Sequence, residues 1–160
     1  MMQISTETAR RSTMTRKETV RLLCKSLVTR LENQKAITFP HRLRSVIQDE
    51  VFGLIGPFIL TEEDLKERVL AKLNANAESL KNSEFTESDQ YKAAKIVILR
   101  SFGDNEWNGL YFQKPIKVIA DTVVSYLMRS SNIEDVFETD EDIERLLLDW
   151  IKKFDEASLH

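Results

Sequence analysis

One pattern of apolar residues occurs twice in this chain of 160 residues, and it constrains the fold more than any other feature. The pattern is a helical stripe over residues 20–31, a short loop with Ile37, and a second stripe over residues 43–54. It returns at an offset of 96 and, after a four-residue insertion, at an offset of 100. The matched pairs are Val20/Ile116, Leu23/Ile119, Cys24/Ala120, Leu27/Val123, Val28/Val124, Leu31/Leu127, Ile37/Ile133, Leu43/Ile143, Val46/Leu146, Ile47/Leu147, Val51/Ile151 and Leu54/Phe154. Two copies at so long a period predict a duplicated pair of helices rather than a solenoid, which needs at least three stacked units. Two unrelated amphipathic helix pairs would also align in this way, and that alternative stays open.

Capping signals indicate where about six helices begin. Thr15-Arg-Lys-Glu18 has the spelling of a capping box and predicts a helix over residues 16–33. Later helices are expected to begin at residues that suit a helix N-terminus, namely Pro40, Thr61, Ser88, Pro115 and Thr139. The residues expected to face inward are Leu43, Val46, Ile47 and Val51 on the second helix and Tyr91, Ala94, Val97, Ile98 and Phe102 on the fourth. The sequence therefore predicts an all-α fold of about six helices, in which two similar helical halves pack as one bundle-like domain.

The ends of the chain differ in composition. Residues 1–14 are rich in Ser, Thr and Arg without apolar periodicity, so we expect a flexible basic tail there. Residues 15–160 are expected to form a single helical domain, with the pseudo-repeat units at 16–55 and 112–155. With only 4 Gly and 3 Pro but 42% apolar residues, a turn-rich all-β or disordered chain is disfavoured. The single Cys, the lack of an N-terminal apolar run and the absence of an apolar stretch longer than ten residues predict a cytoplasmic protein with no membrane partner.

Two stretches carry a resemblance to a known family. The first is the pattern of helix, Ile-containing loop, helix and acidic-start helix over residues 16–73, and the second is Gly103-Asp-Asn-Glu-Trp107-Asn-Gly-Leu-Tyr111. The second is similar to the Gly-x-x-Glu-Trp-x-x-Leu-Tyr signature of the small bacterial domain-of-unknown-function family numbered five hundred and seven. The chain resembles a long, internally duplicated form of that family. The resemblance implies a helical cytoplasmic bacterial protein and brings no catalytic residue, because the family has no established activity.

Residues suited to metal binding or catalysis are sparse. The two histidines, His41 and His160, lie far apart, and Cys24 falls on the apolar face of the first helix, where a thiol behaves as a small hydrophobe. Seven acidic residues lie between Glu134 and Glu144, but they precede or begin a helix, whose dipole favours negative charge, and they lack the glycine of a calcium loop. Phosphate-loop, dinucleotide and nucleophile-elbow motifs do not occur. We therefore expect no catalytic residue, no metal site and no cofactor.

Charge is unevenly distributed along the chain. Residues 1–48 carry ten Lys or Arg and three Glu, whereas residues 49–160 carry thirteen basic and 23 acidic residues. Such asymmetry predicts either an anionic partner or mutual neutralisation of the two ends. The candidate anion-binding or nucleic-acid-binding residues are Lys17, Arg21 and Lys25, which recur every four residues on the first helix, together with Arg42 and Arg44. Lys and Arg at phosphates give affinity without sequence preference, although a pI of about 5.5 and the lack of a recognition motif favour a solvated face.

Aromatic residues supply a second candidate surface. Phe52 and Phe58 lie in the apolar segment 51–60, and Trp107 and Tyr111 are four residues apart in the link between the halves. Exposed aromatics rimmed by charge are typical of protein interfaces, whereas buried ones anchor a core, and we expect Trp107 and Tyr111 to anchor the link. The sequence favours a non-catalytic helical interaction or scaffold protein that binds a protein partner or itself. The alternative is a nucleic-acid-associated protein that binds phosphates through its basic N-terminal surface.

Overall fold

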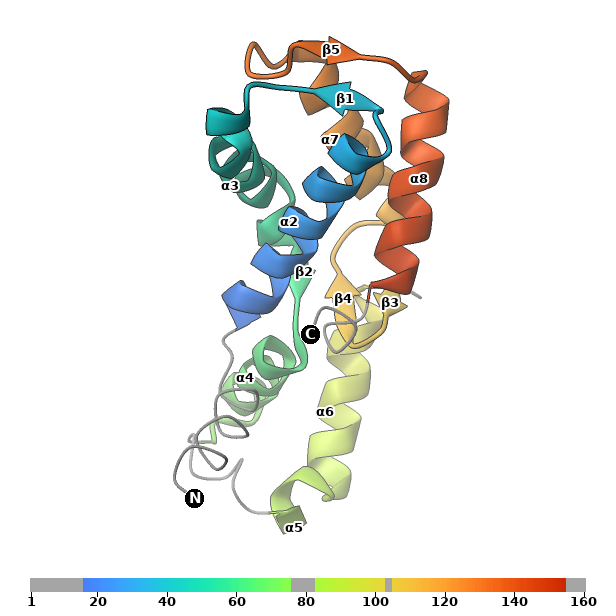
Figure 1. Cartoon of the computed structure of the whole chain (residues 1–160). Coiled ribbons are helices and arrows are strands. Elements are labelled where there is room, and N and C mark those ends of the chain that lie inside the picture. Colours follow the sequence, from blue (N-terminus) through green and yellow to red (C-terminus); the bar gives the residue numbers. More distant parts are fainter. Residues whose placement is uncertain (1–15, 76–82, 103–104, 155–160) are drawn as a thin grey trace, which may run out of the picture.

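The computed structural model describes residues 16–75, 83–102 and 105–154. Within these ranges seven α-helices are joined by short strands and two 3₁₀ turns (Figure 1). In chain order they are α2 (Arg16–Asn33), β1 (Ile37–Thr38), η1 (His41–Leu43), α3 (Arg44–Ile55), η2 (Gly56–Phe58), β2 (Ile59–Leu60), α4 (Glu62–Leu73), α5 (Ser83–Thr86), α6 (Asp89–Arg100), β3 (Glu106–Trp107), β4 (Leu110–Phe112), α7 (Ile116–Arg129), β5 (Asp135–Val136) and α8 (Asp140–Lys153). The predicted helical fold is confirmed, and the six expected helices correspond to α2, α3, α4, α6, α7 and α8.

Local capping explains several of the helix starts. Thr61 and Asp64 form a reciprocal capping box at α4, in which the Thr61 amide donates to Asp64 Oδ2 over 2.9 Å and the Asp64 amide donates to Thr61 Oγ1 over 3.4 Å. The hydroxyl oxygens of Ser88 and Thr139 accept from backbone amides three residues ahead, at 3.2 and 3.1 Å. The predicted starts at these three residues are confirmed. The expected cap at Thr15 and the tail over 1–14 lie outside the described residues.

The main core lies between the two predicted repeat units. The helices α2 and α3 pack against each other, as do α7 and α8, and the units meet along two seams, α3 with α7 and α2 with α8. At one end of the molecule β1 and β5 pair antiparallel, with Ile37 opposite Val136 and Thr38 opposite Asp135 (Figure 1). The matched residues of α2 and α7 are all buried. The origin of the two units by duplication remains a prediction.

The remaining helices form a second, smaller core at the opposite end of the molecule from β1 and β5 (Figure 1). Helices α4 and α6 pack against each other and meet the main core through a small sheet of order β2-β4-β3. Neighbouring residues on a strand point to opposite faces, so Leu110 and Phe112 of β4 enter the main core whereas Tyr111 enters the second. Strand β4 therefore joins the two cores.

Two residues predicted to face inward, Val46 and Val97, are exposed, and so is Leu54 from the same apolar stripe as Val46. On α3 the buried residues are Ile47, Val51 and Ile55, and Val46 and Leu54 are 41% and 39% exposed because they lie on the neighbouring face of that helix. Val97 is 50% exposed because α6 buries only the face that meets α4. These side chains leave apolar surface outside both cores.

The link around Trp107 also differs from the prediction. The all-α prediction placed no strand in this link, but residues 106–112 form a β-hairpin in which Trp107 pairs with Leu110. Asn108 and Gly109 occupy its turn with φ of 51° and 85°, the left-handed values that an Asn-Gly turn adopts. The Asn108 side-chain amide donates to the carbonyls of Lys152 and Phe154 at 2.8 and 2.9 Å, so the hairpin also holds the end of α8.

Candidate functional site

The structure does not bring the five predicted cations together as one free surface. Arg21 forms an ion pair of 2.7 Å with Asp49, and Arg44 forms one of 2.8 Å with Glu32. Residues 21 and 32 lie eleven residues apart on α2, which corresponds to about 16 Å along the helix. Two of the five cations are therefore neutralised within the fold, at separate places on the α2–α3 pair.

The other three cations contribute less to a common surface. Lys25 and Arg42 are exposed and form no ion pair with a described residue. The side chain of Lys17 lies outside the described residues. Lys25 lies near the middle of α2, whereas Arg42 lies in η1, before the start of α3. The described part of the predicted anion-binding set is thus dispersed.

The four predicted contact aromatics are occupied by contacts within the chain. Phe52, Phe58 and Trp107 are half-buried against the main core, and each ring lies under a cation. The cations lie at 4.3 Å (Arg21 to Phe52), 4.1 Å (Lys114 to Phe58) and 5.2 Å (Lys152 to Trp107) from the ring centroids. Tyr111 is buried in the second core, so the structure does not place the four side chains on one open face.

Tyr111 belongs to a hydrogen-bonded cluster that links three elements. Its hydroxyl donates to Glu62 Oε2 over 2.7 Å, and Lys95 Nζ donates to Glu62 Oε1 over 2.7 Å. Burial raises the pKa of Glu62, but the hydrogen bonds from Lys95 and Tyr111 and the positive charges of Lys95 and Lys66 together outweigh burial and leave it below the ordinary value. Burial, and then the bond to Glu62, raises the pKa of Tyr111. The cluster ties β4, α4 and α6 together and has the character of a structural element.

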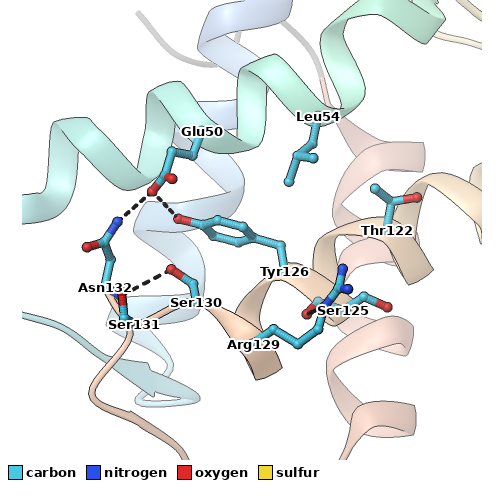
Figure 2. Close-up of a pocket in the computed structure, with 9 residues that line it drawn as sticks. All are labelled: Glu50, Leu54, Thr122, Ser125, Tyr126, Arg129, Ser130, Ser131 and Asn132. Atoms are coloured by element: carbon cyan, nitrogen blue, oxygen red, sulfur yellow. Dashed lines mark hydrogen bonds between the residues drawn. The ribbon is translucent and has the colours of Figure 1, made fainter.

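A polar groove runs along the seam between α3 and α7, and sequence reasoning missed it (Figure 2). It encloses about 540 Å³. Its lining consists of Glu50 and Leu54 from α3 and of Thr122, Ser125, Tyr126, Arg129, Ser130, Ser131 and Asn132 from α7 and the loop that follows. Four of the nine lining residues carry aliphatic hydroxyls, so the groove offers many hydrogen-bonding groups.

Glu50 is held across the seam by two hydrogen bonds. Its Oε1 accepts from the hydroxyl of Tyr126 over 2.7 Å and from the side-chain amide of Asn132 over 2.6 Å (Figure 2). Its other oxygen, Oε2, accepts no hydrogen bond from a described residue, and Glu50 forms no ion pair within that part of the chain. Burial, together with the bond to Glu50, raises the pKa of Tyr126. The carboxylate is therefore fixed in place while half of its accepting capacity stays open.

Arg129 lies on the opposite bank of the groove. Its Nε donates to the carbonyl oxygen of Ser125 over 3.1 Å, a contact within its own helix. Its guanidinium forms no ion pair with a described residue. The groove thus carries one unpaired anion on the α3 bank and one unpaired cation on the α7 bank, as judged over the described chain.

The equivalent seam on the other side of the molecule has different chemistry. At the offsets of the repeat, Arg30 corresponds to Tyr126 and Trp150 to Glu50. In the α2–α8 seam Arg30 lies over the ring of the buried Trp150, 5.9 Å from its centroid. The same pair of positions therefore meets in both seams, as a cation and an aromatic ring in one and as a phenol and a carboxylate in the other. The phenol and the carboxylate line the polar groove.

The described residues offer little else for chemistry. No group of three or more His, Cys, Asp or Glu among them lies close enough to hold a metal ion. Cys24 is buried, and burial raises the pKa of its thiol to about 12. No described helix is both long enough and apolar enough to span a membrane. Comparisons with models of protein families, with curated proteins and with solved structures found no significant match.

Proposed function

We propose that this protein is a non-catalytic helical interaction or scaffold protein whose contact surface is the α3–α7 groove. The supporting observation is that exposed aliphatic side chains border this groove. Val46 and Leu54 lie one turn before and one turn after Glu50 on α3, and Val118 lies one turn before Thr122 on α7. These three aliphatic side chains are 41%, 39% and 40% exposed. A patch of exposed aliphatic residues with unpaired charges and hydroxyls has the mixed character of a transient protein interface.

The chemistry of the groove favours binding over catalysis. Of its nine lining residues Glu50 is the one carboxylate, and none is a His, Cys or Lys. A general base or an activated nucleophile needs a second ionisable side chain of one of these kinds within hydrogen-bond reach. Glu50 instead contacts a phenol and an amide, which position it without activating it.

The second candidate function is nucleic-acid binding through contacts to the phosphates. It rests on the exposed cations Lys25 and Arg42, with Lys17 as a further member, and it is weakened by the pairing of Arg21 and Arg44 with acids. Titration with a short mixed-sequence RNA at two salt concentrations tests it. Phosphate binding would weaken steeply with salt and fail when Lys25 and Arg42 become Ala.

A photo-crosslinking amino acid introduced at Leu54 tests the groove as an interaction surface, with the same label at Ile96 as the control. Ile96 is also exposed and apolar, but it lies on α6, away from the seam. In cells that express the protein, we expect a discrete adduct from position 54 that is lost when Arg129→Glu is added, and none of the same mass from position 96. Equal labelling from both positions, or an adduct that does not depend on Arg129, would show that the groove is not the contact surface.

Residence in the cytoplasm and membership of the small bacterial family named above remain parts of this proposal.

A further inference from the structure

We infer that the groove is occupied by a second copy of the same chain, related to the first by a twofold axis that passes through the α3–α7 seam. This inference rests on the proposed function and assigns the partner of that surface. Closed twofold dimers are the commonest assemblies of soluble proteins, and they require a patch that is complementary to itself. The groove has this property in its charges.

The charge pattern is what makes the surface self-complementary. Glu50 lies on the α3 bank and Arg129 on the α7 bank, and neither forms an ion pair within the described chain. A twofold axis through the groove exchanges the banks, so Arg129 of each copy would lie against Glu50 of the other. Glu50 Oε2, which accepts no bond from a described residue, is available to such a guanidinium. The dimer would therefore contain two equivalent ion pairs between Arg129 and Glu50.

The aliphatic border supports the same arrangement. Because Val46 and Leu54 flank Glu50 along α3, apolar side chains border the carboxylate on both sides, whichever way the opposing helix runs. Apolar contacts around a charged pair exclude water from it and strengthen it. Val118 extends the border on α7.

The size of the surface sets the expected strength. Helix α3 has 12 residues and α7 has 14, so they are about 18 and about 21 Å long. With a width of about 10 Å for each helix, the flat face covers about 400 Å², roughly half of the 800 Å² that each partner contributes to a standard interface. We therefore expect a weak dimer whose population rises with protein concentration.

The dimer can be tested with charge reversals on the purified full chain by sedimentation velocity between about 1 μM and about 1 mM, the range in which weak interfaces populate. The wild type is expected to pass from monomer to dimer. Arg129→Glu and Glu50→Lys should each weaken the dimer by about tenfold or more, because each places two like-charge pairs in the interface. An equimolar mixture of the two variants should recover dimer. In a mixed pair the introduced lysine meets the introduced glutamate at one contact, the native Arg129 meets the native Glu50 at the other, and no like charges meet.

Controls separate this inference from misfolding and from the proposed function. Among the described residues Arg129 forms hydrogen bonds only within its own helix, so its reversal should leave thermal unfolding unchanged, and Arg145→Glu on α8 makes the same charge change elsewhere. A dimer that Arg145→Glu weakens as much as Arg129→Glu would overturn the inference. So would a mixture that stays monomeric while Glu50→Lys, which also loses its hydrogen bonds to Tyr126 and Asn132, keeps the circular-dichroism spectrum of the folded wild type. A wild type that stays monomeric throughout would overturn it too, while an Arg129-dependent adduct of Leu54 with a different protein would leave the proposed function standing.

Discussion

Replacing Tyr111 with Phe should destabilise the junction between the two cores, because Tyr111 links β4 to α4. The substitution removes one hydroxyl, which donates to Glu62 Oε2 over 2.7 Å, and leaves the ring in place. Tyr111 is 8% exposed, whereas the side chain of Glu62 is 41% exposed. The lost bond is therefore one between a buried donor and a carboxylate that water can still reach.

The magnitude follows from that difference in exposure. Hydrogen bonds to charged groups contribute about 1.5 to 3 kcal/mol, and the lower end applies when solvent can replace the missing partner. We expect Tyr111→Phe to lower the free energy of unfolding by about 1.5 kcal/mol. For a chain of this length, that corresponds to a fall in Tm of roughly 3 to 6 °C.

Urea unfolding followed by far-UV circular dichroism is the assay, applied to Tyr111→Phe, Glu62→Gln and the double variant. Because both residues belong to one cluster, the losses should not add, and the coupling energy should be about 1 kcal/mol. If the slope of the unfolding free energy against urea concentration is unchanged, the variants alter stability and not the compactness of the folded or unfolded state. Lys95→Met provides a second test of the same carboxylate from the α6 side.

The cluster also predicts how stability depends on pH. The pKa of Glu62 is lower in the folded protein than its ordinary value of 4.5, so its contribution is present above pH 4.5 and is lost as the pH falls through the folded value. The wild type should therefore lose more stability than Glu62→Gln when the pH is lowered from 7 into that acidic range. A Tyr111→Phe variant as stable as the wild type, or a coupling energy near zero, would refute the assignment of this cluster as the link between the cores.

Three further predictions follow from buried side chains. Trp107→Phe should change the free energy of unfolding by less than about 1 kcal/mol, because the buried indole Nε1 has no hydrogen-bond partner among the described residues, and a thermal melt checks this. Cys24, buried and with a pKa of about 12, should react with a thiol reagent only as fast as the protein unfolds, as absorbance kinetics in increasing urea would show. Leu65→Ala, which empties a fully buried position in the second core, should cost about 2 to 5 kcal/mol, whereas Leu54→Ala at an exposed position should cost about 0.5 kcal/mol or less in the same urea assay.

The helices could be predicted from the sequence because their signals are local. Thr61, Ser88 and Thr139 each precede an amphipathic run and accept the amide three residues ahead, so four residues suffice to place a helix start. The apolar stripes of α2 and α7 likewise identify their buried faces without reference to the rest of the chain. Val46 and Leu54 were misplaced because the width of a buried face depends on the neighbouring helix, which the stripe alone does not reveal.

The strands and the groove needed information from elsewhere in the chain. Strands β1 and β5 have two residues each, and each exists because the other lies beside it, so neither carries a signal of its own. The β3–β4 hairpin is an exception, because Asn108-Gly109 lies between apolar residues and an Asn-Gly pair in that setting is a strong local signal for a hairpin. The ion pair between Arg21 and Asp49 joins residues 28 apart in sequence, and no pattern within α2 predicts it.

The two seams explain why the repeat located the core but not the candidate site. Apolar positions match in the two predicted repeat units because both units must fill the same kind of core, so the pattern is shared even where individual side chains differ. Positions 30 and 150 meet in one seam and positions 126 and 50 in the other, yet the side chains are Arg and Trp in the first and Tyr and Glu in the second. Packing thus requires contact at these positions without fixing its chemistry. A surface specific to one seam has to arise where matched positions diverge in polarity, and within the described chain the groove beside Glu50 is such a place.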